Sequence, residues 1–271
     1  MSDLLKRFLT AVVAGFIFLG AVFGGQLTYS LLFGLVIVLG LWEYFDLVEK
    51  SGFKAQRLLG LIVGSTLFVT DILVHFYGKP IELFLLPLVV LFFTMPVELY
   101  RNRKDPFINI ALGLFGLLYF ALPITLLNHV VQINHVDGYD PMFLLAFFML
   151  IWASDTGAYF AGINFGKHKL FERVSPKKTW EGAAGGVILS LIIGACFAYG
   201  YPVMEMWKWM VLSIIASIAG IYGDLVESLL KRNVGVKDSG SILPGHGGVL
   251  DRFDSILLAT PPAFVFLQLF F

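Results

Sequence analysis

The residue types best suited to chemistry gather near the end of the chain. Residues 221–233 read IYGDLVESLLKRN, and on a helix Asp224, Glu227 and Lys231 lie on one face because they are three and seven positions apart. Ser228 shares that face. The face is acidic within an apolar stretch and becomes basic at its end, so it can serve a cation and an anion together.

A glycine-rich polar segment follows this helix and leads to two further aspartates. It contains His246, Gly247 and Gly248, and Asp251 and Asp254 come after it, three positions apart. Carboxylates converging from two helices would suit Mg²⁺, which prefers oxygen ligands and is usually held by one or two carboxylates plus substrate phosphates. The glycines would let backbone N–H groups approach an anion closely.

Basic residues flank the same segment, namely Lys231, Arg232, Lys237 and Arg252. Their charges suit phosphate oxygens, so the whole group favours phosphoryl or nucleotidyl transfer. No nucleophile elbow is present, which excludes a serine hydrolase of the α/β type. Each part also has a plainer interpretation, because aspartates favour helix starts, basic residues favour cytoplasmic loops and glycines form turns.

A second polar cluster lies at residues 164–181, NFGKHKLFERVSPKKTWE, which we expect to be a loop. Its candidate substrate-binding residues are Ser175, Lys177, Lys178, Thr179 and Glu181. Since a helix N-terminus attracts anions, the segment could hold a phosphate. The alternative is an ordinary basic loop with Thr179 as the helix cap. Asp155, upstream, shares a helix face with Tyr159, either for binding or for a packing hydrogen bond.

The elements that position these residues must be membrane helices. Of the 271 residues, 58% are hydrophobic and only 14% are charged, with a mean hydropathy of +0.84. Soluble domains carry about 25% charged residues, so the sequence predicts an all-α, polytopic integral membrane helical bundle. The zero net charge argues against a nucleic-acid partner, and one cysteine excludes a disulfide framework, a cysteine zinc site and an iron–sulfur centre.

About nine apolar runs have the length that a membrane span needs. They cover roughly residues 8–24, 27–47, 58–76, 80–99, 107–128, 141–162, 180–200, 206–230 and 252–271. The first run lacks a small-residue cleavage site, so we interpret it as a retained span. We predict a single transmembrane domain over residues 1–271, with the catalytic motifs concentrated in 152–254.

The basic residues predict the orientation of these spans. With the N-terminus in the cytoplasm, 17 of the 19 Lys and Arg residues fall on the cytoplasmic side, and only Lys79 and Lys208 fall on the other. This arrangement places both polar clusters at the cytoplasmic border. Three acids near span ends, Glu43, Asp46 and Glu98, are expected to lie simply at the membrane interface.

The stretch from Ser228 to Asp254 resembles the signature of the phosphatidate cytidylyltransferases, also called CDP-diacylglycerol synthases. The runs SDTGAY at 154–159 and SPKKTWEG at 175–182 are also similar to that family. The matching positions of the signature are Ser228, Lys231, Arg232, Lys237, Asp238, Pro244, His246, Gly247, Gly248, Asp251, Arg252 and Asp254. A match at so many fixed polar positions is far more specific than a lone short motif.

The resemblance implies that CTP and phosphatidate give CDP-diacylglycerol and pyrophosphate, with Mg²⁺ required and K⁺ as a candidate second cation. It implies that Asp224 and Asp251 hold the metal, and it suggests a homodimer in the cytoplasmic (inner) membrane. We predict catalytic roles for Asp224, Asp251, Asp254, Lys231 and Arg252. The predicted substrate-binding residues are Asp155, Ser175, Lys177, Lys178, Thr179, Glu181, Ser228, Arg232, Lys237, His246, Gly247 and Gly248.

Two other classes of protein share part of this pattern. An ion-coupled transporter could use intramembrane Asp155, Asp224 and Glu227 to bind its ion. Such a protein predicts acids near the membrane midplane without a matching set of phosphate-binding cations. Another lipid-linked transferase or a kinase would share the metal chemistry but not the signature.

Overall fold

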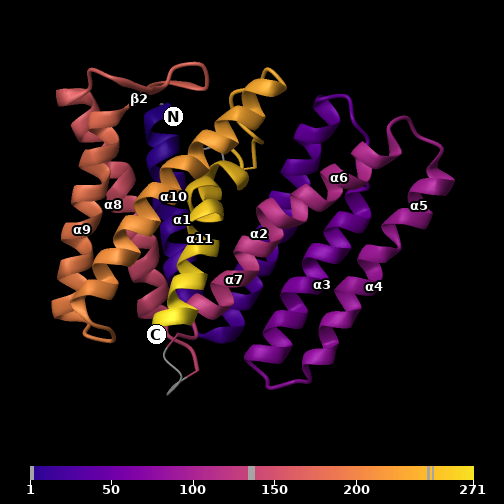
Figure 1. Cartoon of the computed structure of the whole chain (residues 1–271), viewed down its shortest axis with the longest axis horizontal. Helices are drawn as coiled ribbons and strands as arrows, with labels where there is room; N and C mark the ends of the chain where they lie inside the picture. The colour runs from indigo at the N-terminus through magenta and orange to yellow at the C-terminus, as the bar shows by residue number, and fades with distance from the viewer. Residues whose placement is uncertain (1–2, 134–137, 243–244, 246) are drawn as a thin grey trace. The chain divides into compact units, whose positions relative to one another are not determined.

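The computed structural model describes residues 3–133, 138–242, 245 and 247–271, with side chains from residue 9 onward (Figure 1). Of the predicted site residues, His246 lies outside the described residues. In chain order the elements are α1 Asp3–Phe23, α2 Gln26–Lys50, α3 Arg57–His75, the 3₁₀ helix η1 Ile81–Phe84, α4 Leu85–Phe92, α5 Thr94–Arg101, α6 Pro106–Gly116, the π-helix η2 Leu117–Ala121, α7 Leu122–Val130, α8 Pro141–Phe165, β1 Lys169–Phe171, β2 Ser175–Thr179, α9 Trp180–Gly200, α10 Met206–Asn233 and α11 Leu250–Phe270.

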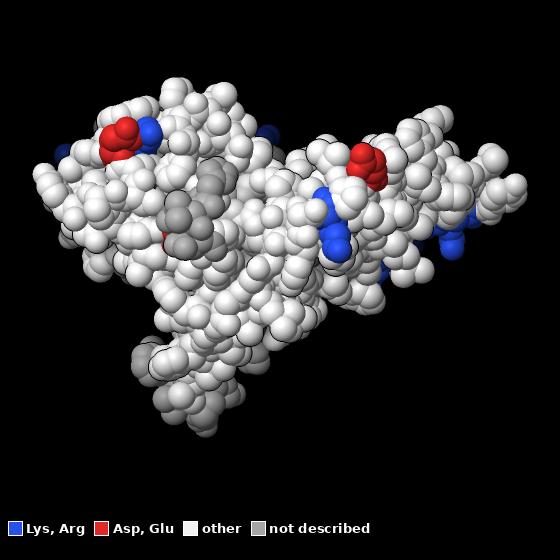
Figure 2. All heavy atoms as spheres, turned by 90° about the horizontal axis from the view of Figure 1, so that it is seen from below, with Lys and Arg blue, Asp and Glu red and all other residues white. Residues whose placement is uncertain are grey.

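The helices follow the expected membrane spans. Within the described residues, eight helical segments are long and apolar enough to cross a membrane, namely α2, α3, residues Ile81–Arg101, residues Pro106–Val130, α8, α9, α10 and α11. Helix α1 adds a shorter apolar stretch, Leu9–Phe23. The face drawn in Figure 2 carries only scattered charged side chains. The prediction of an all-α, multi-pass membrane protein is therefore confirmed.

The chain divides into two compact units. The first comprises residues 1–128 and 233–252 and the second comprises residues 129–232 and 253–271. The prediction of one transmembrane domain over the whole chain stays a prediction.

Helix α2 lies at the centre of the first unit. Its fully buried residues recur at every fourth position and so form one stripe, made of Tyr29, Phe33, Ile37, Leu41 and Phe45. Glycines on other helices make room for these large rings, because a methyl group on Gly60 would overlap the ring of Phe45. The dense packing fixes α2, and with it the acidic side chain of Glu43, which is only 2% exposed.

Small residues hold α8 and α9 together in the second unit. A methyl group on Gly157 would stand 2.6 Å from the carbonyl oxygen of Gly185, and one on Gly186 would stand 2.7 Å from that of Ser154. Figure 1 shows the two helices side by side, with the β-hairpin at one end. Strands β1 and β2 of this hairpin are antiparallel, with Lys169 opposite Thr179. The expected loop at 164–181 is thus largely a hairpin rather than an irregular segment.

Candidate active site

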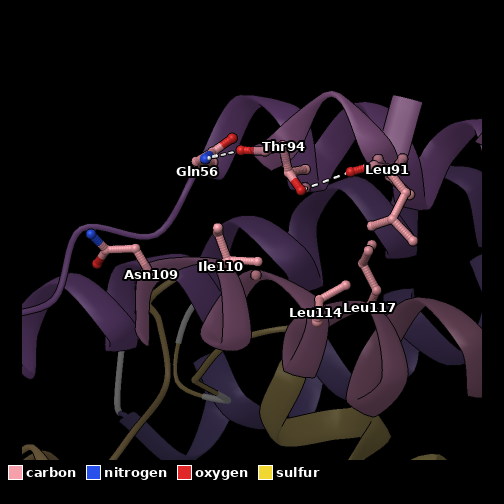
Figure 3. Close-up of a pocket in the computed structure, with 10 residues that line it drawn as sticks. Gln56, Leu91, Thr94, Asn109, Ile110, Leu114 and Leu117 are labelled. Atoms are coloured by element: carbon pink, nitrogen blue, oxygen red, sulfur yellow. Dashed lines mark hydrogen bonds between the residues drawn. The ribbon is translucent and has the colours of Figure 1, made fainter. Parts of the chain in front are cut away.

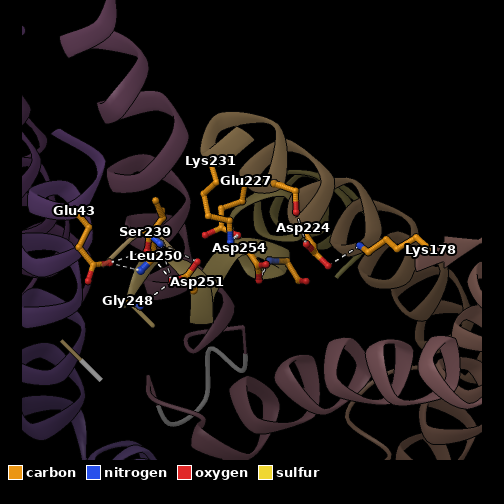
Figure 4. Close-up of polar contacts among 12 residues, drawn as sticks. Glu43, Lys178, Asp224, Glu227, Lys231, Ser239, Gly248, Leu250, Asp251 and Asp254 are labelled. Atoms are coloured by element: carbon orange, nitrogen blue, oxygen red, sulfur yellow. Dashed lines mark hydrogen bonds and ion pairs between the residues drawn. The ribbon is translucent and has the colours of Figure 1, made fainter. Parts of the chain in front are cut away.

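Three carboxylates converge in the second unit, and we call Asp224, Glu227 and Asp254 the acidic cluster. Asp224 and Glu227 come from α10 and Asp254 comes from α11. One oxygen from each residue lies within 4.8 Å of the others (Figure 4). The predicted convergence of carboxylates from two helices is confirmed for these three residues.

One glycine of α10 allows this convergence. A methyl group on Gly223 would overlap the carbonyl oxygen of Asp254 and stand 2.9 Å from the Cα atom of Ser255, whereas one on Gly220 would make an ordinary contact, 3.5 Å from the Cβ atom of Ser255. Because Gly223 has no side chain, the backbones of α10 and α11 approach closely at this point. The close approach brings Asp254 beside the acidic face of α10.

Two lysines pair with the acidic cluster. The Lys231 Nζ atom lies 2.6 Å from Oε2 of Glu227, one turn away on α10. The Lys178 Nζ atom lies 2.7 Å from Oδ2 of Asp224 and also donates to the backbone carbonyl of Ile221. Glu227 is 1% exposed whereas the Asp224 side chain is 37% exposed, so Asp224 is the more open end of the cluster.

Local hydrogen bonds explain how the hairpin presents Lys178. The Thr179 hydroxyl accepts from the backbone N–H of Gly182 and caps α9, as one interpretation of the sequence predicted. The Glu181 carboxylate accepts from the backbone N–H groups of Lys167 and His168 and contacts the His168 ring at 2.6 Å. Thr179 and Glu181 therefore fasten the hairpin to α9, while Lys178 reaches across to α10.

Two of the other predicted residues of the second unit, Ser228 and Asp155, interact with this cluster. The Ser228 hydroxyl donates to Oδ1 of Asp224 at 3.2 Å. Asp155 is exposed on α8 within electrostatic reach of Lys178 and Asp224. Lys177 and Arg232 are exposed and Ser175 is partly buried.

The remaining predicted residues belong to the first unit. The Asp251 carboxylate accepts hydrogen bonds from the backbone N–H groups of Gly248 at 2.7 Å and Ser239 at 3.0 Å, and from the Ser239 hydroxyl at 3.0 Å. Lys237 and Arg252 are exposed. The backbone of Gly247 has a φ of +80° and packs against the Asp251 carboxylate, which explains why glycine stands there.

The sequence interpretation missed several residues that build these sites. Glu43 was expected to lie simply at the membrane interface, yet its carboxylate accepts from Leu250 N and from the Ser239 hydroxyl (Figure 4). Gly223 had no assigned role. The available signals were an acid in an apolar span and a glycine in α10, but neither identifies its partner.

A separate small pocket in the first unit has different chemistry. Its walls are mainly apolar side chains of α3, α4, α6 and η2, with Gln56, Thr94 and Asn109 as the polar members (Figure 3). Gln56 donates to the carbonyl of Thr94 at 2.8 Å. The pocket contains none of the predicted catalytic residues, so the polar clusters remain the better candidates for chemistry.

The fold and the acidic cluster together define a multi-pass membrane protein with carboxylates and ammonium groups arranged to bind a hard cation and phosphates. Residues 5–270 match the cytidylyltransferase family. The chain belongs to this family, as the resemblance in its signature predicted.

Named relatives cover nearly the whole chain. The chain is 34% identical to the phosphatidate cytidylyltransferase of Bacillus subtilis over 100% of both proteins. It is 34% identical to the protein of that name from Staphylococcus aureus, over 94% of this chain and 95% of the relative. It is 32% identical to the Haemophilus influenzae protein of the same name, over 86% and 87% respectively. Nothing in these comparisons favours an ion-coupled transporter.

Proposed function

We propose that this chain is a membrane-bound phosphatidate cytidylyltransferase, which makes CDP-diacylglycerol and pyrophosphate from CTP and phosphatidate. The observation that carries the proposal is the acidic cluster with its lysine partners, in a chain whose named relatives match it end to end. Carboxylates alone would suit many metal proteins. Carboxylates beside ammonium groups also suit the phosphates of a nucleotide and of a lipid headgroup.

The reaction depends on the alignment of the reacting phosphates and on neutralisation of their charge more than on acid–base chemistry. A phosphate oxygen of phosphatidate attacks the α-phosphorus of CTP, the bond to the bridging oxygen of the β-phosphate breaks, and pyrophosphate leaves with that electron pair. The attacking phosphate is already anionic, so no strong general base is required. We assign Lys178 and Lys231 to the phosphates near the acidic cluster, with Ser175, Lys177, Arg232, Lys237 and Arg252 as further phosphate-binding residues.

The donor set of the acidic cluster fits a divalent hard cation such as Mg²⁺. Asp224, Glu227 and Asp254 supply only carboxylate oxygens within 4.8 Å of one another, and Mg²⁺ prefers such oxygens together with substrate phosphates. When bound, the cation would offset the negative charge that develops on the phosphate oxygens. Asp251 stays a predicted metal ligand. Its Oδ2 atom already accepts hydrogen bonds from Ser239 and Gly248, so Oδ1 is the oxygen that we assign to the cation.

The finer assignments extend this proposal. The positive-inside pattern supports a cytoplasmic N-terminus and an active site that faces the cytoplasm from the inner membrane. The family resemblance supports a homodimer and K⁺ as a second cation.

The direct test uses the full chain purified in detergent with Mg²⁺, labelled CTP and phosphatidate. We expect labelled CDP-diacylglycerol that depends on both phosphatidate and Mg²⁺. A product signal no higher than that of a control without enzyme would overturn the proposed function. Diacylglycerol in place of phosphatidate is the matched control, because it lacks the attacking phosphate.

A further inference from the structure

Glu43 forms a long-range contact that the proposed chemistry does not use directly. It lies on α2, yet its Oε2 atom accepts from the backbone N–H of Leu250 at 2.9 Å and from the Ser239 hydroxyl at 3.3 Å. These partners follow it by about 200 positions in the chain, and all three residues belong to the first unit. A buried acid in a membrane span is costly, so such a residue usually has a specific role.

The signature segment leaves room for this carboxylate. A methyl group on Gly240 would overlap Oε1 of Glu43, and one on Gly248 would overlap Oε2 of Glu43 and the Ser239 hydroxyl. Only glycine permits so close an approach at both positions. The two arms of the segment, residues 237–240 and 247–252, therefore close around the end of the Glu43 side chain.

Asp251 completes the arrangement from the other side. Its Oδ2 atom accepts from the Ser239 hydroxyl and from the N–H groups of Ser239 and Gly248. Ser239 has one hydroxyl hydrogen, so it can serve only one of the two carboxylates at a time. We call Glu43, Ser239 and Asp251 the loop clamp, and Figure 4 shows their side chains pointing toward one another.

We propose that Glu43 is a positioning residue for the cytidylyl transfer, which acts by fixing the two arms that carry Lys237, Asp251 and Arg252. This inference rests on the proposed function. In this proposal Glu43 acts through its contacts with Ser239 and Leu250 and not through a contact with substrate. It satisfies the first backbone N–H of α11, where a carboxylate is also favoured by the helix dipole, and so holds the start of that helix in one place. Small displacements of groups that align reacting phosphates reduce the rate steeply.

Glu98 offers a matched control in the same unit. It is 3% exposed and accepts hydrogen bonds from Gln56 at 2.6 Å, Asn109 at 2.9 Å and Arg101 at 2.6 Å. These three partners lie between residues 56 and 109, so none of them belongs to the two arms. Both glutamates are buried and hydrogen-bonded, but only Glu43 reaches the signature segment.

The experiment compares Glu43→Leu, Glu43→Gln and Glu98→Leu in the full chain, with two readouts. The first is kcat and KM for CTP and for phosphatidate. The second is hydrogen–deuterium exchange of peptides that cover the two arms. We expect Glu43→Leu to lower kcat at least about tenfold, with less than about threefold change in the KM for phosphatidate, and to speed exchange at Ser239, Gly248 and Leu250. We expect Glu43→Gln to recover most of the kcat, because its amide oxygen accepts the same hydrogen bonds.

Unchanged exchange in the arms of Glu43→Leu would overturn the proposal. So would an equal loss of kcat in Glu98→Leu, because a general loss of stability would then explain both. If Glu43→Leu does not fold, Ser239→Ala removes the shared hydroxyl and is expected to speed exchange in the same arms. A wild-type chain without product would overturn the proposed function, while the exchange rates would still decide whether Glu43 fixes the arms.

Discussion

The acidic cluster and the loop clamp use the same type of residue in opposite ways. In the acidic cluster, Asp224 and Glu227 pair with the ammonium groups of Lys178 and Lys231. In the loop clamp, Glu43 and Asp251 accept from backbone N–H groups of the signature segment and from one serine hydroxyl. A lysine ammonium stands on a long, flexible side chain, whereas a backbone N–H is fixed by the chain itself.

This difference suits the acidic cluster to ligand binding and the loop clamp to fixing the geometry of the signature segment. A carboxylate paired with a mobile ammonium can exchange that partner for a metal ion, and the ammonium can then meet a phosphate oxygen. A carboxylate bonded to backbone N–H groups cannot leave them without exposing unsatisfied donors, which costs about 1–3 kcal/mol for each buried group. We therefore propose that the acidic cluster binds the cation and phosphates and that Glu43 and Ser239 of the clamp fix the loop, while Asp251 stays a predicted metal ligand.

The largest effect is expected in the acidic cluster. Asp224→Asn and Asp254→Asn should each lower CDP-diacylglycerol formation by about 100-fold or more, which is about 2.7 kcal/mol of transition-state stabilisation. The loss of a negative oxygen should also raise the Mg²⁺ concentration required for half-maximal rate, as measured by a Mg²⁺ titration. Full activity of either variant at the wild-type Mg²⁺ requirement would remove that residue from the proposed metal site.

A smaller effect is expected at the lysine of the hairpin. Lys178→Met should lower kcat/KM for CTP by about 10- to 100-fold, since a hydrogen bond to a charged group is worth about 1.5–3 kcal/mol. Lys169→Met changes an exposed lysine on the partner strand and serves as the control. Equal kinetics for the two variants would show that the pairing with Asp224 has no part in the reaction.

A glycine substitution tests the clamp while both of its carboxylate residues are kept. Gly248→Ala should displace the Glu43 side chain, with a cost of about 1–3 kcal/mol typical of overpacking, and lower kcat by about tenfold. Gly113→Ala is the control, because a methyl group there meets no atom within 4 Å. Thermal unfolding together with steady-state rates measures both effects. Similar values for the two variants would contradict the tight fit of Gly248 against Glu43.

The smallest effect is expected at Asp46, an acid three positions beyond Glu43. It pairs with Arg57, and its side chain is 41% exposed, so the ion pair is worth about 0–1 kcal/mol. Asp46→Asn should leave kcat within about twofold of wild type, while Glu43→Leu should not. A large loss of rate in Asp46→Asn would show that negative charge near this end of α2, rather than the specific contact of Glu43, matters.

Much of the fold and part of the site could be predicted from the sequence. The spans follow from apolar runs long enough to cross a bilayer, and the face shared by Asp224, Glu227, Ser228 and Lys231 follows from helical periodicity. The structure bears out that face in the contacts of Ser228 with Asp224 and of Lys231 with Glu227. These are local relations, set within one or two turns of a helix.

Glu43, Asp46 and Glu98 mark where prediction from sequence stops. All three are acids near the ends of apolar runs, so hydropathy gives them one interpretation. In the structure, Glu43 belongs to the loop clamp and Asp46 forms a half-exposed ion pair with Arg57. Glu98 is buried and accepts hydrogen bonds from its neighbours. Their differences depend on which distant segment packs against each helix, and a periodic pattern contains no information about that.

The sequence by itself determined the membrane class, the spans, the helix face of α10 and the family, because each depends on residue types at fixed spacing along the chain. Only the tertiary structure decided that Asp254 joins Asp224 and Glu227, that Lys178 reaches α10 from a hairpin, and that Glu43 holds the signature segment. The first of these contacts depends on the close helix approach at Gly223, and the last depends on the space left by Gly240 and Gly248. The role of a glycine at such a position can be recognised only when the atoms that pack against it are known.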